Sequence, residues 1–289
     1  MKTLLFCLAS IAAASDEAYV DAGPLALPET AGPIAAVAAG LKDRIYVFNR
    51  GEVPILVFNS EGGFIKGWGR GLFVTPQGRR VDMLGNLWTA DSGNHVVRKF
   101  APDGSLIRTY GEVGVPGDGA GHFRDPKDIA VGWLGRVYVA DAGNSRVVRL
   151  LRDGAFSAEF GRGRLGTASS VAIDARERIY IADGGNSRVF VFTPEGKRVG
   201  EWPGLGSPFG LLVIGEQLLV SDAGASRILQ LDMKGSVQNE WRAGLNARWS
   251  ADLPAASPAS GPRSMTVDKQ GKLYLVDAEG KSVRGYVKR

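Results

Sequence analysis

Short apolar runs separated by turn residues recur along the chain. Residues 126–161 read PKDIAVGWLGRVYVADAGNSRVVRLLRDGAFSAEFG, where the runs DIAV, RVYVA, RVVRL and AFSAEF alternate with segments rich in Gly, Asp and Asn. Short apolar runs bounded by such residues are typical of β-strands joined by tight turns. Because one sheet of four short strands cannot bury both of its faces, copies of this unit must pack against one another.

The chain contains six copies of this unit. The first copy ends at Gly69, and the others begin at Pro76, Pro126, Ala168, Pro208 and Pro262. A polar residue ends the second run of every copy: Asn49, Asp91, Asp141, Asp183, Asp222 and Asp277. A period of about 40 residues with four strands is that of a propeller blade. The sequence therefore predicts an all-β fold, a six-bladed β-propeller of four-stranded blades.

The sixth copy stops after its third run, at Val287. A three-stranded last blade would leave an open outer edge, which folded proteins avoid. Residues 18–27 precede the first blade and are free to supply the missing strand. We therefore expect the ring to be closed by an N-terminal strand that pairs with the end of the chain.

The first residues of the chain have the pattern of a secretory signal peptide. Lys2 precedes the apolar run 4–14, and small residues follow at Ala12, Ala14 and Ser15. We assign residues 1–15 to a signal peptide and residues 16–289 to a single propeller domain. The run is too short for a membrane span, which needs about 20 apolar residues. We expect a secreted or periplasmic monomer without a transmembrane anchor.

Composition and charge narrow the chemistry of the protein. Its only cysteine, Cys7, lies in the predicted signal peptide, so disulfides, thiolate metal sites and cysteine nucleophiles are excluded from the mature chain. The formal net charge of +5 comes from interspersed acids and bases. No basic run with interleaved aromatic residues is present, so nucleic acid is not an expected partner.

The residues that recur in the loop after the second run have structural explanations. The Asp after the second run and the Asn three residues later favour side-chain to backbone hydrogen bonds and left-handed turns, with the intervening Gly relieving the steric cost. The Arg that follows reaches a nearby carboxylate or carbonyl. We assign this structural role to Asp91, Asp141, Asp183, Asp222, Arg146, Arg188 and Arg227. We expect the aromatic residues that end the fourth runs to pack between blades: Trp68, Tyr110, Phe160, Trp202 and Trp241.

One face of the predicted disc carries the variable loops. Because strands in a blade alternate in direction, the loop from second to third strand and the connection to the next blade share this face, which we call the loop-rich face. It includes two insertions, residues 112–125 and 242–261. The second is either a lid that carries Trp249 or a surface loop. Binding sites are expected on this face.

Alignment of the first strands places one side chain per blade at the mouth of the axial channel: Ala35, Gln77, Lys127, Ser169, Phe209 and Arg263. This ring lacks His, Asp and Glu, so we expect no metal site. A small anionic ligand would suit its cations. The candidate ligand-binding residues are Arg50, Gln77, Arg80, Lys127 and Arg263. Alternatively, the charged ends of Lys127 and Arg263 extend into solvent without a binding role.

Several segments resemble a known family. VFNRG from Val47, WGRGLF from Trp68, TPQGRRVDMLGNLWTADSGNHVVRKF from Thr75 and PGDGAGHFRDPKDIAV from Pro116 resemble the Asn-His-Leu (NHL) repeat propellers. Within these they resemble the peptidyl-α-hydroxyglycine α-amidating lyases, over about residues 20–200. The resemblance implies a six-bladed, secreted or lumenal enzyme that cleaves a hydroxyglycine-extended peptide to an amide and glyoxylate at an axial zinc ion.

The active site implied by the resemblance is not matched. The family's three zinc-binding histidines correspond to Gln77, Ser169 and Arg263, and its catalytic tyrosine belongs to a third-blade loop that here reads DAGNSR. Arg50 does match the family's substrate-binding arginine. The two histidines of this chain, His95 and His122, match positions that are not zinc ligands, and a lone loop histidine is usually structural.

Two principal hypotheses follow. The first is a non-enzymatic module that binds an unknown protein or a small anionic ligand at the loop-rich face and needs no cofactor. The alternative is an amidating-lyase-like enzyme with a rebuilt site, in which Arg50 orients a substrate carboxylate and zinc is the cofactor. A third hypothesis is a sugar-lactone hydrolase of the related calcium propellers. It needs acidic and Asn ligands near the axis, and the axial ring lacks them.

Overall fold

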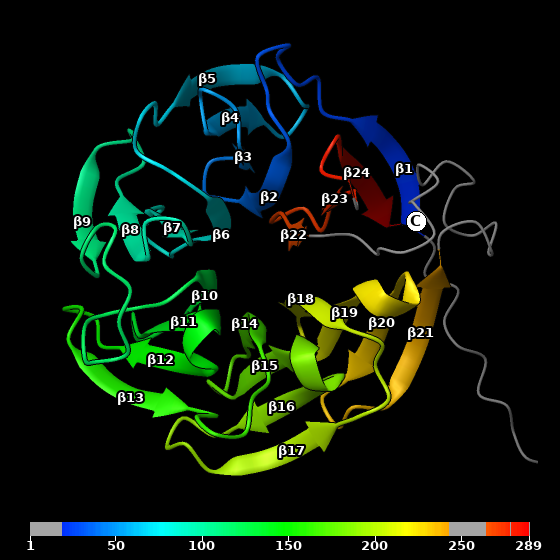
Figure 1. The fold of residues 1–289 in the computed structure, drawn as a ribbon. Helices are drawn as coiled ribbons and strands as arrows, with labels where there is room; N and C mark the ends of the chain where they lie inside the picture. Colours follow the sequence, from blue (N-terminus) through cyan, green and yellow to red (C-terminus); the bar gives the residue numbers. More distant parts are fainter. Residues whose placement is uncertain (1–18, 243–263, 278, 289) are drawn as a thin grey trace, which may run out of the picture.

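The computed structural model describes residues 19–242, 264–277 and 279–288. Its strands form six antiparallel sheets of four strands each, and these sheets stand around a common axis like the blades of a propeller (Figure 1). The predicted all-β, six-bladed architecture is confirmed. In the described part of the chain no helix is long and apolar enough to cross a membrane.

In each blade the four strands lie in the following order from the axis outward, with the innermost strand first. Blade 1 consists of β2 (Ile34–Ala39), β3 (Arg44–Asn49), β4 (Ile55–Asn59) and β5 (Phe64–Trp68). Blade 2 consists of β6 (Pro76–Val81), β7 (Leu87–Asp91), β8 (Val96–Phe100) and β9 (Leu106–Tyr110). Blade 3 consists of β10 (Pro126–Val131), β11 (Val137–Asp141), β12 (Arg146–Leu150) and β13 (Phe156–Phe160). Blade 4 consists of β14 (Ala168–Ile173), β15 (Ile179–Asp183), β16 (Arg188–Phe192) and β17 (Arg198–Trp202). Blade 5 consists of β18 (Pro208–Ile214), β19 (Gln217–Asp222), β20 (Arg227–Asp232) and β21 (Val237–Arg242). Blade 6 consists of β22 (Ser264–Val267), β23 (Leu273–Val276), β24 (Val283–Lys288) and β1 (Tyr19–Pro24). Short 3-10 helices join the second and third strands of blades 3, 4 and 5 at Ala142–Asn144, Gly184–Asn186 and Ala223–Ala225.

The two ends of the chain close the ring together, as predicted. Strand β1 pairs antiparallel with β24, so that Val20 lies opposite Val287. The pairing continues beyond the strand, where the Leu25 amide donates to the carbonyl of Val283 at 2.8 Å. The guanidinium of Arg284 on β24 forms an ion pair with the carboxylate of Asp21 on β1. The outer edge of blade 6 is therefore covered by the N-terminal strand.

The hydrophobic core lies between neighbouring blades. Trp88 and Tyr110 of blade 2, for example, pack into one cluster with Ile129, Val137 and Val148 of blade 3. The Trp68 and Phe100 rings meet across blades 1 and 2 with centroids 4.9 Å apart. The aromatic residues that end the other fourth strands join similar clusters, namely Phe160 with blade 4, Trp202 with blade 5 and Trp241 with blade 6. Their predicted packing between blades is confirmed.

The buried aspartate that ends the second strand holds the loop leading into its own blade. The Asp141 carboxylate accepts hydrogen bonds from the Arg124 amide at 2.7 Å, the Asn144 side chain at 2.8 Å and Arg146 Nε at 2.7 Å. Asp183 and Asp222 make corresponding contacts with the amides of their leading loops and with Arg188 and Arg227. These contacts confirm the structural role predicted for the repeated aspartates and arginines.

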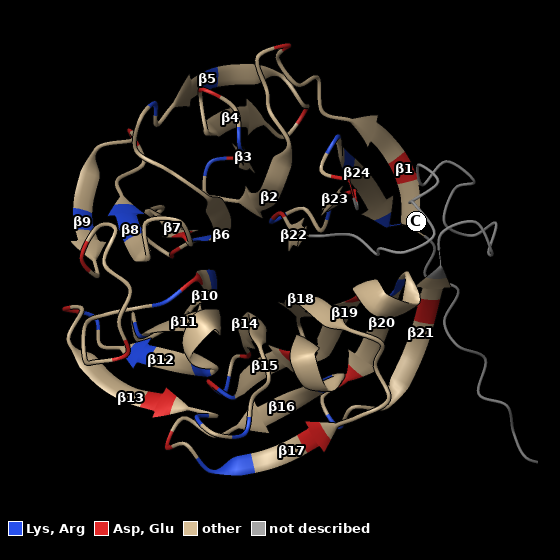
Figure 2. Ribbon diagram, in the orientation of Figure 1, with Lys and Arg blue, Asp and Glu red and all other residues tan. Residues whose placement is uncertain are grey.

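Each of these arginines also joins its blade's third strand to its fourth. Arg146 pairs with Glu159 at 2.8 Å, and the equivalent pairs are Arg188 with Glu201 at 2.8 Å and Arg227 with Glu240 at 3.3 Å. Figure 2 shows the acidic ends of β13, β17 and β21 that receive them. Blade 2 departs from this scheme because Val96 takes the place of the arginine, and Arg98 reaches Asp91 from two residues further along at 3.1 Å.

The loop contains the expected left-handed residue, but this residue is not the repeated Asp, Gly or Asn. The positive φ angles belong to the next residue along, at His95 (57°), Ser145 (50°), Ser187 (57°) and Ser226 (51°). The glycine has a different function. A Cβ on Gly143 would lie 2.6 Å from Cγ and 2.8 Å from the carbonyl oxygen of Arg124. The glycine is therefore needed because the turn packs directly on the loop leading into the blade.

Candidate functional site

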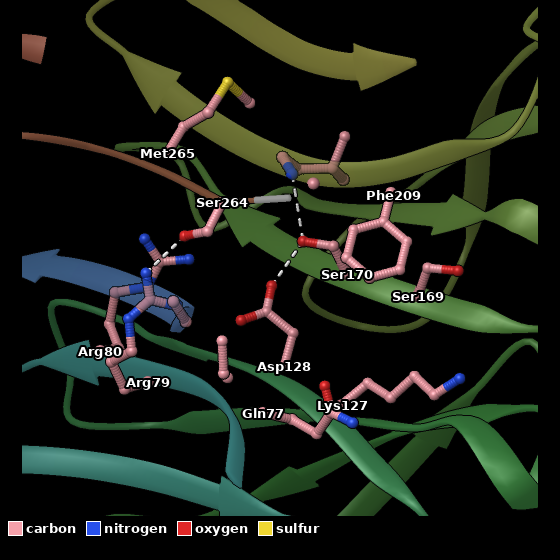
Figure 3. Close-up of a pocket in the computed structure, with 15 residues that line it drawn as sticks. Gln77, Arg79, Arg80, Lys127, Asp128, Ser169, Ser170, Phe209, Ser264 and Met265 are labelled. Atoms are coloured by element: carbon pink, nitrogen blue, oxygen red, sulfur yellow. Dashed lines mark hydrogen bonds between the residues drawn. The ribbon is translucent and has the colours of Figure 1, made fainter. Parts of the chain in front are cut away.

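The innermost strands surround a cavity on the propeller axis (Figure 3). Five of the six side chains predicted at the channel mouth line it: Ala35, Gln77, Lys127, Ser169 and Phe209. The sixth, Arg263, lies outside the described residues, as does Trp249 in the second insertion. The cavity has a volume of about 50 Å³, which is room for a few water molecules or one small anion.

Arg79 on β6 enters this cavity from a position that other blades fill with apolar residues. Its register relative to the second strand is shared by Val37, Ile129, Val171, Leu211 and Met265. The side chain is buried, and its guanidinium donates to the carbonyl of Val37 and to the hydroxyl of Ser264. The Nε of Arg79 has no hydrogen-bond partner among the described residues.

The positive charge of Arg79 is buried and is not neutralised by an ion pair with a described residue. Burial lowers the pKa of its guanidinium well below the ordinary value, while the nearby Asp128 carboxylate partly opposes this by raising the pKa. Arginine nevertheless stays protonated in proteins. Among the described residues no carboxylate forms an ion pair with Arg79. A buried positive charge with one unused donor therefore lies in the wall of the axial cavity.

Asp128 is held on the other side of the cavity by blade 4. Its carboxylate accepts hydrogen bonds from the Ser170 hydroxyl and, at 3.2 Å, from the Val171 amide. Ser170 Oγ accepts in turn from the Leu211 amide of blade 5 at 3.1 Å. Figure 3 shows this chain of contacts between the innermost strands. Both of the hydrogen bonds to Asp128 are made to Oδ2, and they hold the carboxylate against blade 4.

The other predicted ligand-binding residues differ in how they relate to the cavity. Lys127 Nζ lies 3.6 Å from Asp125 Oδ2, so its charge is partly compensated at the rim. The Gln77 amide donates to Ser92 Oγ at 3.4 Å. Arg50 is exposed in the loop after β3 and is not among the residues that line the cavity. The structure thus groups Gln77 and Lys127 and leaves Arg50 apart from them.

Arg80 lies at the boundary between two axial cavities. It lines the axial cavity described above. It also lines a second cavity further along the axis, of about 110 Å³, whose walls include Ala130, Ala172 and Leu212. Its Nε donates to the carbonyl of Ile129 at 3.2 Å, which anchors the side chain to blade 3. The channel therefore changes from polar above Arg80 to mainly apolar below it.

The two histidines lie away from the axial cavity. His95 Nδ1 accepts a hydrogen bond from the Asp125 amide at 3.2 Å, which joins blade 2 to the loop leading into blade 3. His122 Nε2 lies 3.8 Å from Glu112 Oε2 within the first insertion. Over the described ranges, no three His, Cys, Asp or Glu side chains gather in a way that could hold a metal ion.

Sequence reasoning aligned only the mouth position of each first strand and therefore missed Arg79. The sequence does contain a signal for Arg79. An arginine stands two residues after Gln77, at a position that is apolar in the other five copies. What could not be read from the sequence is that its Nε is left without a partner. That depends on where blades 1, 3 and 6 place their acceptors.

Comparison with known proteins agrees with this architecture. A family model described as NHL repeat matches residues 123–150 and 165–192, which lie in and immediately before blades 3 and 4. A search of curated proteins gave no match.

Solved structures share the fold at low sequence identity. A streptogramin B lyase superposes with a TM-score of 0.70 at 14% identity, covering 92% of this chain and 97% of the other. A catalytically inactive virginiamycin B lyase from Staphylococcus aureus, solved with quinupristin, gives 0.66 at 11% identity, covering 92% and 98%. A chain of the nidogen/laminin complex gives 0.64 at 20% identity, covering 72% and 80%. At these identities the likeness concerns the fold alone. The chain is a six-bladed β-propeller that contains NHL repeats.

Proposed function

We propose that the protein is a secreted binding module whose axial cavity receives a small carboxylate or phosphate ligand from the loop-rich face, without catalysing a reaction. The observation that carries this proposal is the buried guanidinium of Arg79, whose Nε lacks a partner among the described residues. Secretion rests on the signal-peptide pattern of residues 1–15.

A buried arginine without a paired carboxylate is costly for the folded protein. Removing a charge from water costs several kcal/mol unless a partner compensates it. The blade architecture does not need a charge here, because Ile129, Val171 and Leu211 fill the equivalent positions. An anion in the cavity would neutralise the charge. The residue therefore fits a binding role better than a packing role.

The remaining wall of the cavity favours an anion of small size. Three cationic side chains line it, at Arg79, Arg80 and Lys127, against the single carboxylate of Asp128. The Oδ2 atom of Asp128 already accepts hydrogen bonds from Ser170 and Val171. A volume of about 50 Å³ accommodates one carboxylate or phosphate group but not a peptide chain.

The comparisons leave the choice between binding and catalysis to the site itself. Propellers of this shape include two lyases and a chain of the nidogen/laminin complex, and one fold commonly hosts unrelated functions. At the positions that correspond to the zinc histidines of the amidating lyases, this chain carries Gln77, Ser169 and Arg263. Two of these are neutral and one is a cation, which suits an anion better than a metal.

The test compares wild type with Arg79→Met, which mimics the Met265 found at the same register in blade 6. Phosphate and succinate at about five times their Kd should raise the Tm of wild type by about 2–4 °C at constant ionic strength. The same additions should leave the Tm of Arg79→Met unchanged. Without ligand the variant should be as stable as wild type or more stable, because replacement of a buried charge by an apolar side chain is often favourable.

Arg176→Gln is the control, because Arg176 is exposed in the turn after β14 and should leave the ligand response intact. An equal ligand-induced rise in Arg79→Met and wild type would refute binding at this cavity. Stoichiometric zinc in the purified protein, together with glyoxylate release from a hydroxyglycine peptide, would establish the lyase alternative instead.

A further inference from the structure

A second cavity, of about 350 Å³, opens between blades 2 and 3 at the turns that join their first and second strands. These turns lie on the face opposite the loop-rich face, because the strands of a blade alternate in direction. Met83 and Leu84 come from the turn between β6 and β7, and Trp133 and Leu134 from the turn between β10 and β11. Trp88 on β7 forms part of the same wall. The cavity is within the range of small-molecule sites, about 300–1,000 Å³.

The apolar side chains at these two turns are open to solvent. Met83 is 61% exposed, Leu84 68%, Trp133 64% and Leu134 64%. By contrast, the Trp88 indole beneath them is buried and donates from Nε1 to Asp82 at 3.0 Å. A group of large exposed apolar side chains around a cavity is typical of an interaction site.

The fold does not require apolar residues at these turns. The Gly85 amide donates to Asp82 and the Gly135 amide to Gly132, both at 2.9 Å, and the turns of blades 4 and 6 close in the same way at Glu177 and Gly271. In every other blade the tip of the corresponding turn includes at least one polar or charged residue: Lys42 (next to the exposed Leu41), Arg176, Glu216, Lys269 and Gln270. The wholly apolar tips of blades 2 and 3 therefore need an explanation other than turn geometry.

The charges at the rim favour an anionic group. Lys99 Nζ lies 4.9 Å from the Trp88 ring centroid and 3.6 Å from Asp82 Oδ2, so these two opposite charges compensate each other. Asp82 is further committed by hydrogen bonds from the backbone and side chain of its own turn. Arg152 packs its aliphatic stem on Gly135 and has no ion pair within the described part of the chain. One uncompensated cation thus remains beside an apolar cavity.

We propose that this cavity binds a small amphipathic carboxylate, with its apolar body between the turns of blades 2 and 3 and its carboxylate on Arg152. Met83, Leu84, Trp133 and Leu134 supply the apolar contact area, and the guanidinium of Arg152 supplies a planar pair of donors for the carboxylate. The site is separate from the axial cavity, and its ligand differs by requiring an apolar body.

The probe is decanoate below its micellar concentration. Its binding is followed by calorimetry and by the intrinsic tryptophan fluorescence, to which Trp88 and Trp133 at the cavity contribute. Decanoate should bind at one site and change the tryptophan emission. Arg152→Gln should weaken binding about tenfold through loss of one charge-assisted interaction. Trp133→Ala should weaken it by a similar factor through lost apolar contact, measured by calorimetry alone. Both side chains are exposed, so neither variant should alter the melting temperature appreciably.

Arg176→Gln, at the equivalent turn of blade 4, and Arg79→Met, in the axial cavity, serve as controls and should bind decanoate as wild type does. Equal affinity for decanoate, decanol and decyltrimethylammonium would overturn the assignment of a carboxylate to Arg152. Failure of decanoate to bind would overturn the proposal as a whole. The proposal would also be overturned if decanoate does not bind and the protein instead forms a dimer, or adsorbs to anionic vesicles, in a way that Trp133→Ala abolishes.

Discussion

At the scale of single residues, close contacts rather than turn conformation decide several positions that recur in every blade. Gly143 follows the buried aspartate of blade 3, and its backbone lies against the loop that leads into the blade. Arg146 fills the space beneath the same loop and donates to Asp141 and Glu159 while fully buried. These residues join the outer strands of blade 3 to the loop that enters the blade. Small changes of side-chain volume there should therefore affect stability.

Gly143→Ala should lower the free energy of unfolding by about 1–3 kcal/mol, the usual cost of forcing an extra carbon into a packed site. The added Cβ would meet Cγ of Arg124 at 2.6 Å and the Arg124 carbonyl oxygen at 2.8 Å. Urea unfolding of the variant and wild type measures the difference. Gly119→Ala, where a Cβ meets nothing within 4 Å, is the matched control and should change stability by less than about 0.5 kcal/mol. Equal effects at the two sites would contradict the packing argument.

At the scale of elements, the turns between the first and second strands of blades 2, 4 and 6 depend on an aspartate at their start. Asp82 accepts hydrogen bonds from the amides of Leu84 and Asn86 at 2.9 Å each, and Asp174 and Asp268 do the same in blades 4 and 6. Burial by itself would raise the pKa of Asp82, but the hydrogen bonds from Asn86 and Trp88 outweigh it and lower the pKa. The folded turn therefore prefers the ionised carboxylate.

Asp82→Asn should destabilise the protein by about 1–2 kcal/mol at pH 7, because it removes a charged acceptor from the turn. A lowered folded-state pKa means that the stabilisation by Asp82 is present above its ordinary value of 3.8 and is lost as the pH falls through the lower folded value. The stability difference between variant and wild type should therefore shrink below about pH 4. Urea unfolding between pH 3 and 7, about the range in which carboxylates titrate, measures it. A difference that stays constant across this range would contradict an ionised Asp82 in the folded turn.

At the scale of the whole molecule, stability depends on pairing the two ends of the chain. Strand β1 is the outermost strand of blade 6, and the rest of that blade comes from the opposite end of the sequence. Its contribution includes the ladder between Val20 and Val287 and the ion pair between Asp21 and Arg284. Without β1 the ring would keep its innermost strands but expose the edge of β24.

A chain that begins at residue 25 should melt about 10 °C or more below one that begins at residue 16, since several kcal/mol of pairing and packing are lost. Differential scanning calorimetry measures the shift. Arg284→Gln keeps β1 and removes only the cross-strand ion pair, and should cost no more than about 1 kcal/mol. An unchanged Tm in the truncated chain would show that β1 does not close the ring in solution.

The sequence by itself determined the blade, the number of blades, the closure by the N-terminal segment and the position of the residues at the channel mouth. It could do so because strand alternation and turn chemistry are local, and because six copies of one pattern reinforce each other. Gln77, Lys127 and Ser169 line one cavity for the same reason: equivalent positions in a repeat occupy equivalent places around the axis.

Only the tertiary structure decided which of these residues are already engaged. Lys127 is partly compensated by Asp125, Asp128 is held by blade 4, and Arg79 keeps a buried donor without a partner. Likewise, the steric need for Gly143 and the shared cavity of Trp88 and Trp133 arise between segments far apart along the chain. Such contacts depend on how neighbouring blades and loops meet in space, and the local pattern of any one repeat carries no information about that meeting.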